Sequence, residues 1–177
     1  MEKIKFSSLG LLGGSFDPPH YGHLKISKVA LKKLPIRRIN WIITKQNPFK
    51  NKSHFSLEKR ISKCKKILKN NRKIKVKYLD KVVGSSRTFK IINYFKKKNK
   101  KKYIFFLIGA DNLIDFHRWK NYKNILKSCV LVVFSRKGYD KLAKKSILIK
   151  NGYKNNIIFI NNKKFNISST MIKSKLS

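Results

Sequence analysis

The chain has 177 residues, of which 41% are hydrophobic and 12% aromatic, so it can bury a core and is not a disordered segment. Its 45 basic and 7 acidic residues give a formal net charge of +38. No apolar run reaches the length needed to cross a bilayer, which argues against a membrane protein and makes the cytoplasm the expected location.

The positive charge has three interpretations, and the sequence leaves all three open. It could form a nucleic-acid-binding surface, or it could favour small anionic substrates through a positive cleft. It could also be a composition bias in which lysines fill solvated faces. The lysines are spread along the chain and only residues 96–102 form a block, so composition bias is favoured and nucleic acid is the least favoured partner.

Apolar runs and helical patterns alternate along the chain. Continuous runs, typical of strands buried on both faces of a parallel sheet, lie near 9–12, 39–43, 74–79, 103–108, 129–134 and 157–160. Helical periodicity is found near 21–34, 56–69, 88–98, 112–127, 139–149 and 168–176. The alternation predicts one α/β domain over residues 1–177, with a doubly wound, Rossmann-like, mainly parallel sheet and helices on both faces.

Polar motifs follow four of the predicted strands. They occupy residues 13–23, 109–111, 135–136 and 167–170. Because such sheets bind ligands at the carboxyl ends of their strands, these motifs are expected to converge on one site.

The motif at residues 13–23, G-G-S-F-D-P-P-H-Y-G-H, is the most informative of the four. A strand, a glycine turn and a helix place His20 and His23 three residues apart, near unpaired backbone amides that favour an anion. A phosphate-handling site is the first hypothesis, and a pair of surface histidines is the alternative. Asp17 precedes Pro18 and is expected to form the turn and cap the helix. No zinc-ligand spacing is present, so no metal ligand is predicted.

Three other residues have structural interpretations. Cys64 and Cys129 belong to no C-x-x-C pair and are expected to be buried thiols. Ser56 is expected to cap the second helix.

Two motifs resemble signatures of one enzyme superfamily. Residues 14–23 resemble the G-[ST]-F-D-P-x-H-x-G-H signature of the nucleotidyltransferases related to class I aminoacyl-tRNA synthetases. Residues 167–173, I-S-S-T-M-I-K, resemble the I-S-S-T-x-I-R signature of the same superfamily. Within it the chain most resembles the bacterial nicotinate-nucleotide adenylyltransferases. Both histidines of the motif are present, whereas pantetheine-phosphate adenylyltransferases usually have a threonine at the position of His20. Further similar segments are found at residues 47–50, 86–88, 109–119 and 135–139.

This resemblance implies transfer of AMP from ATP to nicotinate mononucleotide, which forms deamido-NAD and pyrophosphate. The attack on the α-phosphorus would be direct, with Mg²⁺ carried by the ATP phosphates. The implied catalytic residues are His20 and His23. The implied ATP-binding residues are Gly14, Ser15, Phe16, His20, His23, Gly109, Asp111, Ser168, Ser169, Thr170 and Lys173. The implied residues for the mononucleotide are Lys50, Thr88, Trp119 and Arg136, although Trp119 could instead be plain core packing.

Three positions depart from the family pattern. Lys173 replaces an arginine, Phe49 stands where histidine is common, and Arg87 stands where an aromatic residue is common. The alternative functions are an adenylyltransferase with another acceptor, such as nicotinamide mononucleotide or pantetheine phosphate, and a basic nucleic-acid-binding protein. No membrane partner is expected, and the oligomeric state stays open between monomer and homodimer.

Overall fold

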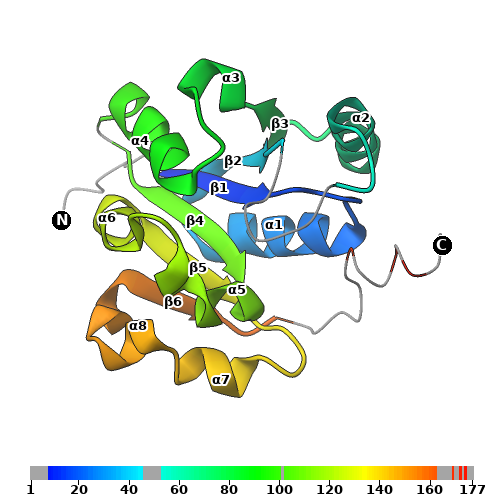
Figure 1. Cartoon of the computed structure of the whole chain (residues 1–177). Coiled ribbons are helices and arrows are strands. Elements are labelled where there is room, and N and C mark those ends of the chain that lie inside the picture. Colours follow the sequence, from blue (N-terminus) through cyan, green and yellow to red (C-terminus); the bar gives the residue numbers. More distant parts are fainter. Residues whose placement is uncertain are drawn as a thin grey trace.

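Six parallel strands form one central sheet in the computed structural model, which describes residues 8–45, 53–100, 102–162, 169, 172 and 174. The strand order is β3-β2-β1-β4-β5-β6 (Figure 1). The strands are β1 (Ser8–Gly14), β2 (Ile36–Ile43), β3 (Ile74–Tyr78), β4 (Ile104–Gly109), β5 (Val130–Phe134) and β6 (Ile157–Ile160). All five pairs are parallel, which confirms the predicted α/β class and all six predicted strands.

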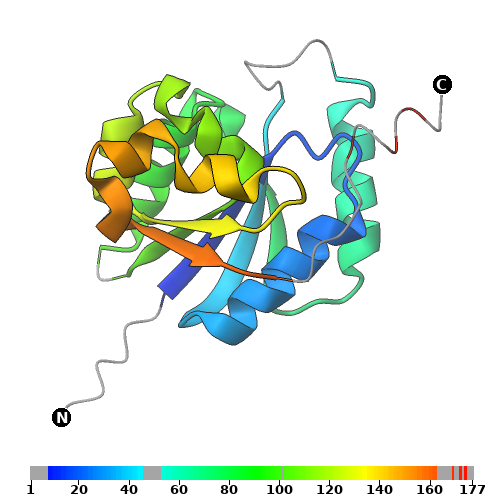
Figure 2. The same ribbon diagram turned by 90° about the horizontal axis from the view of Figure 1, so that it is seen from below.

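Helices cover both faces of this sheet, as Figure 2 shows from below. The helices α1 (Tyr21–Lys33) and α2 (Leu57–Leu68) pack against one face. The other face carries α4 (Thr88–Lys98), α5 (Ala110–Ile114), η1 (Phe116–Arg118), α6 (Tyr122–Ser128), α7 (Asp140–Lys144) and α8 (Ile147–Lys150). Two short elements complete the described chain, α3 (Asp80–Val83) and η2 (Tyr153–Asn156). In the part of the chain that the structure describes, no helix is both long and apolar enough to span a bilayer.

The central strand β1 is apolar because both of its faces are buried. Leu11 packs into the core under α4, α5 and α6, whereas Leu12 packs into the core under α1 and α2. Gly10 lies so close to β2 that a Cβ atom there would be 2.8 Å from Cγ1 of Ile39. Two-sided burial is the reason that the strand shows no alternation of polar and apolar residues.

Two predicted helices are broken. The predicted helix over 112–127 is three short elements, α5, η1 and α6. The first break is at Asp115 (φ −98°, ψ 9°), and the second includes Asn121, whose left-handed backbone (φ 59°) a helix cannot continue through. The predicted helix over 139–149 divides into α7 and α8 at Ser146, which is extended (φ −60°, ψ 157°). The predicted helix over 168–176 lies mostly outside the described residues, although Ser169 and Ile172 are helical.

The strand order reverses between β1 and β4. The helix that follows β1 packs on one face of the sheet, and the helix that follows β4 packs on the other. The carboxyl ends of these two strands therefore lie between diverging helices, which is where doubly wound sheets bind their ligands.

Candidate functional site

The turn after β1 is anchored by a buried phenylalanine. Phe16 is 1% exposed and has a left-handed backbone (φ 48°). Its ring stacks on Trp41 of β2 at 5.1 Å between centroids and lies 4.8 Å from the His23 ring. Its side chain is thus part of the core beneath the histidines, and only its main chain can face a ligand.

The two histidines begin α1 by capping it. His20 is the N-cap residue, and its Nδ1 accepts from the Gly22 amide at 3.1 Å. Nδ1 of His23 in turn accepts from the His20 amide at 3.2 Å. Because main-chain amides only donate, both Nδ1 atoms must be unprotonated, and the ring proton of each neutral imidazole lies on Nε2. Their ring centroids are 3.9 Å apart, so the cap sets two Nε2–H donors side by side.

His20 is held in its neutral form. Burial, and secondly the positive charge of Arg136, lower the pKa of His20 from 6.5 to about 4. The effect of Arg136, two residues after β5, agrees with the expectation that the ends of the strands converge. At neutral pH His20 is therefore a hydrogen-bond donor and not a cation.

Two buried hydrogen bonds, which the sequence does not predict, hold the main chain of His23. Nε1 of Trp41 donates to Oγ of Ser27 at 2.9 Å, and that hydroxyl donates to the His23 carbonyl at 2.8 Å. Ser27 is fully buried although the sequence gives it no special context. This chain of bonds ties the first turn of α1 to the middle of the sheet.

The ends of β4 and β5 meet in an ion pair. Arg136, after β5, donates through Nη1 to Oδ2 of Asp111, in the first turn of α5. The other carboxylate oxygen, Oδ1, is buried without a hydrogen-bond partner among the described residues. Gly109 is needed beside it, because a Cβ atom at that position would collide with Oδ1. Residues that sequence reasoning assigned to ATP and to the acceptor, Asp111 and Arg136, are thus in direct contact.

Asp17 does not cap α1, which corrects the expectation from the sequence. Its carboxylate accepts from the amides of His54 and Phe55, at 2.8 and 2.9 Å, and so binds the segment before α2. The cap is provided by His20 instead. Helix-capping patterns favour Asp, but an Asp three residues before the cap position is too early in the chain to reach the first amides of α1.

The remaining predicted residues fall into three groups. Ser169 is joined to the turn, because its Oγ donates to the Pro18 carbonyl at 2.8 Å. Thr88 begins α4, and Trp119 follows η1, where it is half-buried and stacks on Phe116 at 4.8 Å between centroids. This stacking agrees with the core-packing interpretation of Trp119, and its role toward the mononucleotide stays a prediction. The predicted residues outside the described part of the chain are Lys50, Ser168, Thr170 and Lys173.

Neither cysteine belongs to the site. Both thiols are free and buried, as expected, and burial raises the pKa of Cys64 and of Cys129 to about 12. A thiol with such a pKa is not a nucleophile at neutral pH. Within residues 8–45, 53–100 and 102–162 and the three described C-terminal residues, no three His, Cys, Asp or Glu side chains gather as metal ligands.

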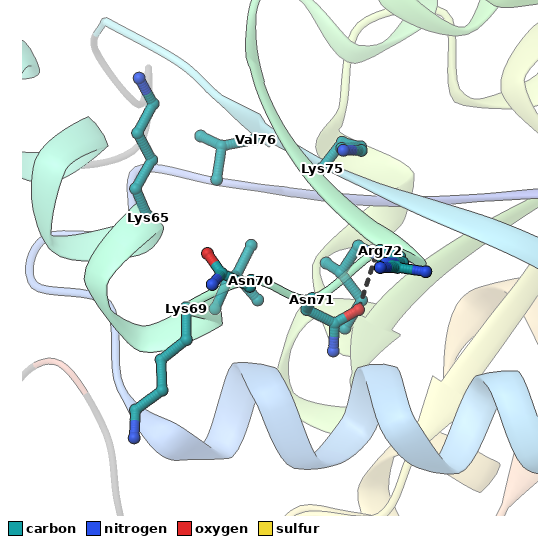
Figure 3. Close-up of a pocket in the computed structure, with 9 residues that line it drawn as sticks. Lys65, Lys69, Asn70, Asn71, Arg72, Lys75 and Val76 are labelled. Atoms are coloured by element: carbon teal, nitrogen blue, oxygen red, sulfur yellow. Dashed lines mark hydrogen bonds between the residues drawn. The ribbon is translucent and has the colours of Figure 1, made fainter.

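A surface hollow of about 400 Å³ lies away from the histidines, at the end of α2 and the start of β3. That is the amino edge of the sheet, opposite to the turn after β1. Its basic lining residues do not converge, since Figure 3 shows Lys65 and Lys69 pointing in opposite directions. A hollow lined in this way is not built around a single anion.

A doubly wound sheet with two histidine donors at the start of its first helix is the arrangement of a nucleotidyltransferase, and the cytidylyltransferase-like family matches residues 11–175. A probable nicotinate-nucleotide adenylyltransferase of Pelagibacter ubique is 50% identical over 169 residues, which cover 96% of this chain and 93% of the relative. A protein of the same description from Clostridium acetobutylicum is 34% identical over 171 residues, or 94% of this chain and 85% of the relative. The chain belongs to the nicotinate-nucleotide adenylyltransferase family.

A solved structure has the same fold. Nicotinic acid mononucleotide adenylyltransferase of Plasmodium falciparum, complexed with NaAD, is similar with a TM-score of 0.76 and 20% sequence identity. The similarity covers 97% of this chain and 84% of that one. At this identity the comparison bears on the fold alone.

Proposed function

We propose that this protein transfers AMP from ATP to nicotinate mononucleotide, releasing pyrophosphate and forming deamido-NAD for NAD biosynthesis. The family relatives carry this activity in their names. The observation in the structure that carries the proposal is the histidine pair, whose capping bonds orient two Nε2–H donors at the carboxyl edge of β1.

The reaction needs electrostatic stabilisation more than proton transfer. A phosphate oxygen of the mononucleotide attacks the α-phosphorus, and the bond from that phosphorus to the pyrophosphate oxygen breaks. The attacking phosphate is already ionised near neutral pH, so no base has to remove a proton from it. Negative charge grows on the α-phosphoryl oxygens, where neutral Nε2–H donors of His20 and His23 stabilise the transition state.

The paired Asp111 and Arg136 can bind one group from each substrate. The unpartnered Oδ1 of Asp111 is an acceptor for a ribose hydroxyl of ATP, and Gly109 gives the ribose room to approach. Arg136 adds positive charge for the acceptor's phosphate or carboxylate. Ser15 and Gly14 contribute main-chain groups, and Ser169 lies beside the turn, where its Oγ donates to the Pro18 carbonyl.

Other assignments rest on the family resemblance. Lys50, Thr88 and Trp119 are assigned to the mononucleotide. Ser168, Thr170 and Lys173 are assigned to the ATP phosphates. By the same resemblance, Mg²⁺ is assigned to the ATP phosphates, where it would offset their charge. ATP as the donor favours the cytoplasm as the place of the reaction.

An acceptor panel tests the proposal. Purified protein is incubated with ATP and Mg²⁺ and with nicotinate mononucleotide, nicotinamide mononucleotide or pantetheine phosphate, and the products are separated by chromatography. We expect deamido-NAD and pyrophosphate in equal amounts, with a kcat/KM for nicotinate mononucleotide well above the other two. Turnover of another acceptor without deamido-NAD would overturn the assignment.

A further inference from the structure

Arg60 is a charged residue in the core of the molecule. It lies on α2 and is 1% exposed, which places it among the largest fully buried side chains. Arginine is almost never fully buried unless it is paired, because removing its charge from water is unfavourable. Its surroundings must therefore compensate the charge.

The compensation comes from four main-chain carbonyls. Nη1 donates to the Ser15 carbonyl at 2.7 Å and to the Thr44 carbonyl at 2.8 Å. Nη2 donates to the Lys45 carbonyl at 2.8 Å, and Nε donates to the Phe55 carbonyl at 3.2 Å. The planar guanidinium, with donors in fixed directions, matches this set in a way that a lysine ammonium cannot.

The four acceptors belong to two loops, the turn after β1 and the two ends of the connection between β2 and α2. Ser15 follows β1, Thr44 and Lys45 follow β2, and Phe55 precedes α2, so none lies in a helix or strand. None of these carbonyls accepts from a main-chain amide of the described residues. Without Arg60 they would lose this partner, at a cost for each carbonyl that water cannot reach.

Asp17 adds a second link between the turn after β1 and the segment before α2. Its carboxylate binds the amides of His54 and Phe55, while Arg60 binds the Phe55 carbonyl. The turn of residues 15–17 is thus fixed to residues 54–55 by donors and acceptors on both sides. His20 and His23 follow this turn directly.

We propose that Arg60 is a positioning residue for adenylyl transfer: it holds the turn after β1 against the end of β2 and the start of α2, and so sets the place of the two histidines. The inference rests on the proposed function and deepens it. Arg60 is buried and touches no substrate, so its effect passes through the turn. A displacement of about 1 Å at a reacting group can lower a rate about 100-fold.

Two substitutions and one matched control test the proposal. Arg60→Met keeps most of the length of the side chain and removes all of its donors. Arg60→Lys keeps the charge but loses the planar guanidinium. Leu68→Ala is the control, because Leu68 is also buried on α2 but makes no bond to the turn. Each variant is assayed for kcat and KM, its thermal unfolding is followed by circular dichroism, and the ring nitrogens of His20 and His23 are observed by NMR.

We expect kcat to fall about 100-fold in Arg60→Met and by a smaller factor in Arg60→Lys, with a smaller change in the KM for ATP. The histidine ring signals should shift in both variants. Leu68→Ala should lose thermal stability while its kcat stays within about threefold of the wild type and its ring signals stay in place.

A folded Arg60→Met with kcat within about threefold of the wild type and unchanged ring signals would overturn the proposal. If Arg60→Met does not fold, Arg60→Lys decides by the same criteria. If the wild type makes no dinucleotide with any acceptor, the proposed function fails, and the ring signals still test the role of Arg60.

Discussion

At the scale of single residues, substitutions can separate the capping role of His20 from its proposed catalytic role. His20→Ala removes both the helix cap and the Nε2–H donor, so we expect a stability loss of about 1 kcal/mol and a kcat lower by a factor of about 10² to 10³. His20→Asn keeps an N-cap acceptor, so it should retain most of the stability and lose the same activity. Urea unfolding and steady-state kinetics measure the two effects.

The exposed His54 provides the control for the two substitutions at His20. His54→Ala changes a side chain at the surface and should leave both stability and kcat near wild type. Near-normal turnover in His20→Asn would contradict the donor role.

His20 also makes stability depend on pH. Its pKa is about 4 in the folded protein and 6.5 ordinarily, so between these values the unfolded chain binds a proton that the folded chain does not. The stabilisation is therefore fully present above pH 6.5 and is lost as the pH falls toward 4. The ring is partly exposed, so about 3 kcal/mol is an upper limit for this loss.

Urea unfolding at several pH values between 4 and 7 measures this dependence. The free energy of unfolding should fall more steeply with acidification in the wild type than in His20→Asn, which has no imidazole at this position. Equal slopes would show that His20 titrates alike in both states.

Sequence patterns identify residues that have a motif and miss those that act through tertiary contacts. His20 and His23 stand in a recognisable glycine turn. Arg60 looks like any basic residue of a helix that carries several, and its acceptors lie 5 to 45 positions away in the chain. Nothing local marks such a residue, because carbonyl groups are present at every position.

At the scale of elements, the close packing of β1 against β2 is testable at Gly10. In Gly10→Ala the new Cβ would lie 2.8 Å from Cγ1 of Ile39 and 3.2 Å from Cγ2 of Ile36. We expect a stability loss of about 1 to 3 kcal/mol from this overpacking. The KM for ATP should not change, since Gly10 lies in the strand and not in the turn. Denaturant unfolding and ATP saturation curves measure both.

Gly13→Ala is the matched control for stability on the same strand. There the added Cβ would lie 3.4 Å from the nearest atoms, in the ring of Phe106, which is ordinary van der Waals contact. If Gly10→Ala is as stable as Gly13→Ala, the neighbouring isoleucines relax freely and the packing argument is wrong.

The elements that the sequence predicts well are those whose pattern is long and apolar. All six strands fall within three residues of their predicted bounds, and α2 begins after Ser56, whose Oγ accepts from the Lys59 amide as expected. Short elements are different. The helix α3 has four residues, too few for a periodic pattern, and the left-handed Asn121 is a property of the turn that periodicity does not register.

At the scale of the whole molecule, the charge of +38 is the dominant property. Seven carboxylates cannot neutralise 45 basic side chains, so the folded chain repels itself. Raising NaCl from about 10 mM to about 0.5 M shortens the Debye length from about 30 Å to a few ångströms, and we expect the Tm to rise. The same screening weakens the attraction of anionic substrates, so the KM for ATP should rise together with the Tm.

Calorimetry and kinetics across the same salt series measure the two trends. A Tm that falls with salt would mean that attractive pairs outweigh the repulsion. A labelled DNA duplex in the same series tests the nucleic-acid alternative. Affinity tighter than about 1 μM at 0.15 M salt, retained in His20→Asn, would favour that alternative.

The capping bonds of α1 join helix fraying to catalysis. The main-chain amides of His20 and Gly22 donate to the Nδ1 atoms of His23 and His20. Opening of the first helical turn would break these bonds, and the ring protons could then move from Nε2 to Nδ1. If the histidines act as proposed, a molecule with a frayed α1 is inactive even when the rest of the sheet is intact. Hydrogen exchange at these two amides reports the fraction of molecules that are ready to react, and substrates that engage Nε2 should slow it.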